Sequence, residues 1–312
     1  MNVLVSPLDW GLGHASRCVP VIANYIAQGH SVTIASSGYA KQFLLLQFPL
    51  LPHLDIPSYN IRYAASKTQI FSMLRNLYRV IKAARSEHAW LQNYLQNHAC
   101  DLVISDNRFG LFSNTTQCIY ITHQVMVKMP KMLTFLEPLV YQLHCKIISK
   151  FHACWIPDAA GSTNLSGDLA HKYPLPNNAR FVGLLSRFSQ LQVEPSSRFD
   201  VVIIISGPEP QRSMFERQCI ETYKSSVEPV LILSGRPGDK EIASPYSHIH
   251  ILPHVPDAEL AAYCLGAKKI ICRSGYSSIM DMSVLNCLSK VVFVPTPGQT
   301  EQAYLALLHT TP

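Results

Sequence analysis

The chain has 312 residues, enough for two domains, because a single hydrophobic core rarely grows beyond about 250–300 residues. Its 48% hydrophobic and 15% charged residues describe a globular protein with an ample core and exclude an intrinsically disordered chain. The net charge of +6 is uneven: residues 1–156 hold 13 Lys and Arg against 6 Asp and Glu, whereas residues 157–312 hold 13 against 14. A basic first half indicates an anionic partner. Because its basic residues occur among aliphatic residues, lipid or lipid phosphate is favoured over nucleic acid as that partner.

The nine cysteines form no CxxC motif and no metal-binding spacing, so we interpret them as small core residues in a reducing compartment. The N-terminal residues lack the charged region and long apolar run of a signal peptide, and no apolar run approaches the ~20 residues of a membrane span. We therefore expect a cytoplasmic protein, with peripheral contact at the inner face of the cell membrane.

The first predicted strand, Val3–Val5, leads into a glycine loop and then a helix that runs to about Gln28. The loop reads Gly11-Leu12-Gly13-His14, which is neither the dinucleotide fingerprint nor a P-loop. Its two glycines allow a ligand close to the backbone, and a histidine at the first helical turn can act as a general base near neutral pH. We predict acceptor contacts at Gly11 and Gly13 and a catalytic role for His14; the alternative is that His14 only forms local hydrogen bonds.

Two later stretches of the first half combine basic and apolar residues. Residues 62–98 predict a long helix with a basic face, and residues 126–151 are rich in Met, Leu and Lys but too interrupted to span a bilayer. A solvated charged face and core packing are the common explanations of such patterns. The alternative is contact with the anionic head groups of a membrane.

Polar residues follow the next two predicted strands of the first half. Asp101–Ser105 is followed by Asp106, Asn107 and Arg108, and Cys118–Thr122 by His123 and Gln124. Carboxyl ends of parallel strands share one edge of a sheet, so we expect these side chains to line one wall of a cleft. Asp106 is a second candidate base, and the other four are candidate acceptor contacts.

A further strand, His152–Pro157, closes a predicted first domain of residues 1–157. Clusters of Gly, Ser, Asn and Pro mark residues 158–199 as a linker region, and residues 200–312 form the predicted second domain. Its first strand, Asp200–Ile205, runs into Ser206-Gly207, which would open a helix as a phosphate cradle does, with Arg212 as a charge partner. His254 follows a later strand, where it would clamp a nucleobase edge.

The stretch from Arg273 to Gln302 carries the strongest functional pattern. Its order is turn, helix, strand, turn and helix after the strand Lys269–Cys272, as expected for a parallel βαβα unit that binds ligands at the strand ends. The small residues Ser274 and Gly275 open a helix, where backbone N–H groups can hold a phosphate. The remaining predicted donor contacts are a carboxylate for a ribose diol and polar groups for sugar hydroxyls: Asp281, Gln299, Glu301 and Gln302. The pattern indicates a nucleotide-sugar site. The alternative is that each glycine or proline only forms an ordinary turn between a strand and a helix.

With these residues placed, the chain resembles the inverting glycosyltransferases of the B-type fold. It is most similar to the family that includes the bacterial lipid-linked N-acetylglucosaminyltransferase of peptidoglycan synthesis. Gly11–His14 resembles that family's glycine-rich loop, His123-Gln124 its acceptor-side strand end, and Arg273–Gly275 its donor loop. By the same resemblance Asp281 takes the place of a ribose-binding Glu, and Glu301 and Gln302 that of a sugar-binding polar run.

The resemblance implies an α/β fold with two Rossmann-like, doubly wound parallel-sheet domains that face a cleft. It also implies transfer of a hexose or N-acetylhexosamine from a UDP-sugar to a hydroxyl of a lipid-linked or glycolipid acceptor, with inversion. No cofactor and no metal are expected. Two departures matter: Asp281 is shorter than Glu, and the chain ends at Pro312, so the second domain is expected to be short.

Two other functions fit the same pattern. A non-hydrolysing UDP-sugar epimerase shares the two-domain architecture and needs no acceptor. A truncated, non-catalytic copy would bind the nucleotide as a scaffold or regulatory partner.

Overall fold

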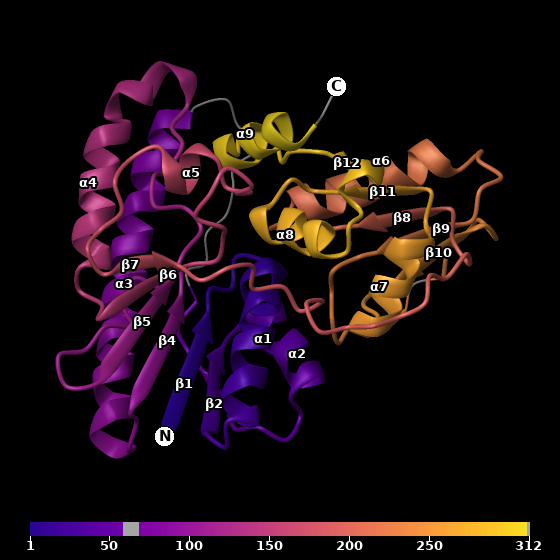
Figure 1. Cartoon of the computed structure of the whole chain (residues 1–312). Helices are drawn as coiled ribbons and strands as arrows, with labels where there is room; N and C mark the ends of the chain where they lie inside the picture. Colours follow the sequence, from indigo (N-terminus) through magenta and orange to yellow (C-terminus); the bar gives the residue numbers. More distant parts are fainter. Residues whose placement is uncertain (59–68, 242, 311–312) are drawn as a thin grey trace. The chain divides into compact units, whose positions relative to one another are not determined.

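The computed structural model describes residues 1–58, 69–241 and 243–310, with side chains omitted for residues 69–77 (Figure 1). The chain forms two compact units, one from Met1 to Leu185 apart from Gly11–Gly13, and one that contains the chain from Ser186 onward. Arg62 and Lys67 of the predicted basic helix lie outside the described residues.

The first unit is a parallel α/β sheet in the strand order β3-β2-β1-β4-β5-β6-β7. Its strands are β1 (Asn2–Pro7), β2 (Ser31–Ser36), β3 (His53–Asp55), β4 (Leu102–Asp106), β5 (Gln117–Ile121), β6 (Ala153–Ile156) and β7 (Ala179–Phe181). Its helices are α1 (Leu12–Ala27), α2 (Gly38–Gln47), α3 (Gln69–Asn97), η1 (Lys131–Leu136), α4 (Glu137–Ile148) and α5 (Asp168–His171). Helices α1 and α2 cover one face of the sheet, and α3 and α4 cover the other (Figure 1).

Both faces of this sheet are covered, which explains why its central strands are apolar runs rather than alternating ones. Every residue of β4 is buried, as are all residues of β1 except Asn2. One core cluster joins Leu91 of α3 and Ile148 of α4 to buried residues of the strands. The order of the strands reverses direction at β1 and β4, and the carboxyl ends of these two strands are where a doubly wound sheet binds ligands.

The second unit is a smaller parallel sheet in the order β10-β9-β8-β11-β12. Its elements are β8 (Val201–Ile204), α6 (Gln211–Tyr223), β9 (Val230–Leu233), β10 (Ile249–Leu252), α7 (Asp257–Gly266), β11 (Lys269–Cys272), α8 (Tyr276–Val284), η2 (Leu288–Lys290), β12 (Val291–Phe293) and α9 (Thr300–His309). Alternate strand residues face two separate cores. Val202 and Leu231 pack with residues of α7 and α8, whereas Val201 and Ile232 pack with residues of α6.

The segment 158–199, predicted as a linker, contains regular structure. It holds α5 and β7, and β7 pairs in parallel with β6 as the last strand of the first sheet. The first unit accordingly extends to Leu185, beyond the expected boundary at residue 157. Short elements with few apolar residues, such as β7, give a weak pattern in a sequence.

Among the residues that the structure describes, no helix has both the length and the apolar character needed to cross a bilayer.

Candidate active site

His14 and Asp106 form a hydrogen-bonded pair at the reversal point of the first sheet. Pro7, the last residue of β1, pairs with Asp106, the last residue of β4, and His14 lies in the first turn of α1. His14 Nδ1 lies 2.6 Å from Asp106 Oδ1. The Asp106 side chain is fully buried, whereas that of His14 is 17% exposed. His14 is therefore the member of the pair that a substrate can reach.

Arg17 completes this cluster, although it was not among the predicted site residues. It lies one turn after His14 on α1, is buried, and contacts both carboxylate oxygens of Asp106 through Nε and Nη2. Its Nη1 lies 2.9 Å from His123 Nδ1. A guanidinium can only donate, so His123 Nδ1 is the acceptor of this hydrogen bond. The i, i+3 spacing of His14 and Arg17 was the available signal, since such residues share one helix face.

The charges of the cluster fix the protonation of its members. Burial alone would raise the pKa of Asp106, but Arg17 and His14 lower this pKa to about 2, so Asp106 is a carboxylate at neutral pH. His14 Nδ1 cannot both donate to Asp106 and accept from Arg17 Nη2, which lies 2.8 Å away. The contact with the carboxylate is the shorter one and a carboxylate only accepts, so we assign the proton to Nδ1, which leaves Nε2 unprotonated.

Burial, together with Arg17, lowers the pKa of His14 below its usual range. The Arg17 Nη2 atom lies only 2.8 Å from His14 Nδ1, which explains the repulsion of a protonated ring. His14 is therefore neutral at pH 7 and offers Nε2 as a proton acceptor.

The other predicted acceptor residues of the first unit differ in availability. Asn107 has a positive φ of 55° and accepts a 3.0 Å hydrogen bond from the Tyr120 hydroxyl. Gln124 is half-buried, and a Cβ placed on Gly11 would meet no atom within 4 Å. Gly13 is also half-buried.

Arg108, by contrast, is fully buried and engaged inside the protein. Its Nη1 donates to Glu87 Oε1 at 2.7 Å, and its Nε donates to the Pro7 carbonyl at 2.8 Å. A ligand contact would have to replace these bonds, so we assign Arg108 to holding the ends of β1 and β4 against α3.

In the second unit, the predicted phosphate loops follow β8 and β11, the two strands at which its order reverses. Gly207 has a positive φ of 102°, which a residue with a side chain rarely adopts. Gly275 caps α8 with an extended backbone, and a Cβ placed there would meet no atom within 4 Å. The start of α8 thus has space beside Gly275, which is one condition for an anion site at a helix N-terminus. Ser206 is half-buried beside Gly207.

Gln302 organises the loop after β12. Its Oε1 accepts the backbone N–H of Thr296 at 2.8 Å, and its carbonyl accepts the Ser274 hydroxyl at 2.7 Å. Since Oε1 is fixed by a backbone donor, the Nε2 group of Gln302 faces away as a hydrogen-bond donor. Gln299 and Glu301 are half-buried at the start of α9.

Three other predicted donor contacts have side chains engaged with the protein. Arg212 pairs with Glu209 and Glu216 and donates to the Ser234 carbonyl at 2.8 Å. Arg273 lies over the ring of Phe215 and donates to carbonyls beyond β12 and at the start of α6, those of Val294, Pro295 and Gln211. These cations tie the strand ends together, and direct binding of a diphosphate by either would require new partners.

Asp281 is the third, and it lies in the interior of the second unit. Its Oδ1 accepts the Ser186 hydroxyl at 2.6 Å, and its Oδ2 lies 3.6 Å from Arg187 Nε. Burial raises the pKa of Asp281 to about 6, against the opposing charge of Arg187. Burial, with the charge of Arg187, lowers the pKa of half-buried His254 to about 4, so this ring is neutral.

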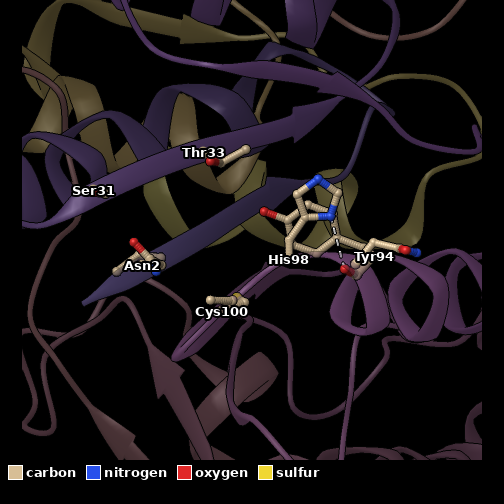
Figure 2. A pocket seen from close by; sticks show the side chains of 9 residues that line it. Asn2, Ser31, Thr33, Tyr94, His98 and Cys100 are labelled. Atoms are coloured by element: carbon tan, nitrogen blue, oxygen red, sulfur yellow. Dashed lines mark hydrogen bonds between the residues drawn. The ribbon is translucent and has the colours of Figure 1, made fainter.

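A pocket of about 420 Å³ lies at the opposite edge of the first sheet, at the amino ends of β1 and β2. Figure 2 shows Tyr94 and His98 on one side and Asn2, Ser31, Thr33 and Cys100 around it. None of the predicted site residues lines this pocket. In the part of the chain that the structure describes, no group of three or more His, Cys, Asp or Glu side chains is placed to hold a metal ion.

Comparison with known proteins agrees with this architecture. The model of the family described as "Glycosyl transferase family 1" matches residues 1–130. No curated protein matches the chain.

Solved structures match over nearly the whole chain. The spinosyn rhamnosyltransferase SpnG is 15% identical, with a TM-score of 0.60 over 98% of this chain and 83% of its own. The calicheamicin glycosyltransferase CalG4 is 10% identical, with a TM-score of 0.58 over 98% and 83%. SpnG complexed with thymidine diphosphate is 13% identical, with a TM-score of 0.56 over 98% and 84%. The predicted fold class is therefore confirmed: the chain has the two-domain, parallel-sheet α/β fold of GT-B glycosyltransferase structures.

Proposed function

We propose that the protein is an inverting glycosyltransferase that moves a hexose or N-acetylhexosamine from a UDP-sugar to an acceptor hydroxyl. The observation that carries this proposal is the His14–Asp106 pair, which stands at the ligand-binding edge of the first sheet. Its support is the match of residues 1–130 to a glycosyltransferase family and the likeness of the fold to GT-B enzymes. A fold alone does not establish a reaction, so the proposal depends on the site.

In the proposed reaction His14 is the general base. Nε2 takes the proton of the acceptor hydroxyl while its oxygen forms a bond to the anomeric carbon. The bond from that carbon to the diphosphate oxygen breaks, and the nucleoside diphosphate leaves with the electron pair. Attack opposite the leaving group inverts the configuration.

Asp106 is assigned a different role from that of an alternative base. It is fully buried and its pKa is about 2, so it neither reaches a substrate nor takes a proton near neutral pH. As in other Asp–His pairs, the carboxylate orients the ring and stabilises the imidazolium that forms. Arg17 positions the carboxylate.

The donor is assigned to the second unit. We place the diphosphate at Ser206-Gly207 and at the start of α8, where helix N–H groups would stabilise the leaving group without a metal. Gln302 Nε2 would donate to a sugar hydroxyl oxygen, beside Gln299 and Glu301. His254 would lie at the nucleobase, and a ribose contact of Asp281 would require the Ser186 hydrogen bond to be exchanged.

For the acceptor we propose a lipid-linked or glycolipid molecule. The support is the basic and apolar character of residues 1–156 and the resemblance of the glycine loop to the lipid-linked N-acetylglucosaminyltransferase family. The rival epimerase would convert a UDP-sugar with no acceptor present. Proton NMR of a UDP-sugar with the protein alone separates the two, because only the epimerase changes the sugar.

Titration calorimetry tests the donor site in the presence of EDTA. The protein is titrated with UDP, TDP, GDP and ADP; TDP is included because SpnG has been solved with thymidine diphosphate. We expect selective UDP binding that Gly275→Trp abolishes. Gly161→Trp is the matched control, since a Cβ at Gly161 also meets no atom within 4 Å. Absence of binding by all four nucleotides would contradict the proposal.

A further inference from the structure

The consecutive helices η1 and α4 expose a row of large apolar side chains. In η1, Met132 and Phe135 are 88% and 73% exposed, and in α4, Leu139 and Leu143 are 54% and 52% exposed. The first two are three residues apart on a 3₁₀ helix and the last two four apart on an α-helix, so each pair lies on one side of its helix. We call these four residues the apolar stripe. Clustered exposed apolar residues of this size mark an interaction surface.

The opposite side of α4 is firmly packed, so the stripe is a fixed feature of the fold. Glu137 is buried and accepts hydrogen bonds from the Met129 backbone and from Lys172 Nζ at 2.7 Å. His144 is buried and donates to the Val125 carbonyl at 3.0 Å, while Ile148 belongs to the core of the unit. Helix α4 therefore exposes the apolar residues of the stripe, while its buried polar residues Glu137 and His144 form hydrogen bonds within the protein.

Within the segment 125–151 the exposed charges have a single sign, and Lys128 of this segment pairs with Asp168 of α5. Lys131, Lys146 and Lys150 are exposed, whereas the one acidic residue of the segment 125–151, Glu137, is buried beneath α4. On the same face of the sheet, α3 exposes Tyr78 and Ile81 beside further basic residues, Lys82 and Arg85 (Figure 1). Apolar side chains among lysines, with no exposed acid in the same segment, complement an anionic lipid surface rather than another neutral protein face.

We propose that the η1–α4 surface docks on an anionic lipid bilayer, with the apolar stripe entering the boundary between head groups and acyl chains. Lys131, Lys146 and Lys150 would contact the lipid phosphates. This inference deepens the proposed function, because a lipid-linked acceptor is met at such a surface, but its test requires no nucleotide.

The test is sedimentation of the full chain with sucrose-loaded vesicles, either phosphatidylglycerol with phosphatidylcholine or phosphatidylcholine alone. We expect binding to the anionic vesicles that added salt weakens. Replacing two apolar side chains, in Leu139→Ser/Leu143→Ser, should weaken binding about tenfold or more. Lys131→Glu/Lys146→Glu should weaken binding to the anionic vesicles and leave the residual binding to phosphatidylcholine unchanged.

The matched control is Leu50→Ser/Leu307→Ser, which changes leucines that are 96% and 81% exposed but lie outside the surface. This variant should bind as the wild type does. Far-UV circular dichroism shows that each variant is folded, and calorimetry with UDP reports the donor site separately.

Three results would overturn the inference. They are no binding of the wild type to anionic vesicles, equal losses in the stripe and control variants, or a self-association that the stripe variant abolishes without any vesicle binding. If UDP binding is retained in any of these cases, only the membrane inference fails and the proposed glycosyl transfer is unaffected. Vesicle binding without UDP binding would instead support the membrane inference and contradict the proposed donor site.

Discussion

The carboxyl edges of the two sheets are built on the same topological plan but carry different chemistry. At the first edge, four titratable side chains are in contact: His14, Arg17, Asp106 and His123. At the second edge, the arginines Arg212 and Arg273 are engaged with carbonyls and acids of their own unit, and the remaining predicted phosphate contacts are backbone groups near Gly207 and Gly275.

The difference indicates that the first edge provides the proton acceptor and the second edge binds the diphosphate. A proton acceptor needs a defined tautomer and a tuned pKa, which burial and charged neighbours together supply at His14. A diphosphate can be held by helix N–H groups. Such binding requires a rigid loop that fixes these groups, and it does not require an arginine side chain that is free to contact the phosphate. The arginines of the second edge supply that rigidity. Changes to the proton acceptor and its charged neighbours at the first edge should therefore alter the reaction as well as stability, whereas changes at the second edge should alter donor binding or stability.

The largest expected effect is that of His14→Ala. Removing a general base should lower turnover about 10²- to 10⁴-fold, while the affinity for UDP in calorimetry stays unchanged. His98→Ala is the control, since His98 is exposed at the opposite edge of the sheet. Turnover at the wild-type rate in His14→Ala would exclude this residue as the base.

Arg17→Gln should affect both stability and the pH profile. It leaves the buried Asp106 carboxylate without its guanidinium partner, which should destabilise the first unit by about 3–5 kcal/mol. Tryptophan fluorescence during urea unfolding reports this unit, because Trp10, Trp90 and Trp155 all lie there. Since Arg17 lowers the pKa of His14, the acidic limb of the activity profile should move to higher pH in the variant. An unmoved limb would contradict the assigned role of Arg17.

Asp281→Asn should change the pH dependence of stability in the second unit. The folded pKa of Asp281 is raised from 3.8 to about 6, so the folded state binds the proton more tightly than the unfolded state. The wild type should therefore lose up to about 3 kcal/mol as the pH rises from 4 to 7, and the loss should level off above pH 6. The variant has no titratable group at position 281, so its free energy of unfolding relative to that of the wild type should rise by up to about 3 kcal/mol over the same pH range.

Urea unfolding followed by far-UV circular dichroism at pH 4, 5, 6, 7 and 8 measures this change. Tryptophan fluorescence of the first unit is the internal control and should show no difference between the two proteins. A constant difference across the pH range would mean that Asp281 is ionised throughout.

The smallest expected effect is that of Tyr120→Phe, which removes the hydroxyl that fixes the Asn107 amide. One neutral hydrogen bond contributes about 0.5–1.5 kcal/mol, so the acceptor KM should rise several-fold with little change in kcat. Tyr25→Phe provides a comparable tyrosine substitution elsewhere in the unit. An unchanged acceptor KM would remove Asn107 from the acceptor contacts.

Much of this organisation could be predicted from the sequence because strands, turns and strand-end polar residues are local patterns. The apolar runs placed β1, β4, β5 and the strands of the second unit, and His14 and Asp106 were expected at the same edge. Their direct hydrogen bond joins residues 92 positions apart and was not expected, nor was the part played by Arg17.

The use of each arginine could not be predicted in the same way. Arg108 and Arg273 follow strands as ligand-binding residues do, yet their partners are carbonyls brought close by the fold, such as Pro7 and Val294. The short strands β3 and β7 were not predicted, because a strand of three residues shows almost no hydrophobic periodicity. The domain boundary was placed too early along the chain relative to Leu185 because β7 was not recognised.

The measurement that tests the central claim most directly is release of nucleoside diphosphate from UDP-sugars in EDTA, with and without a membrane lipid extract. Proton NMR identifies the anomeric configuration of the product. The account predicts UDP release that depends on the extract, an inverted product and loss of both in His14→Ala. Release that is equal without any acceptor, a retained configuration, or full activity of His14→Ala would contradict it.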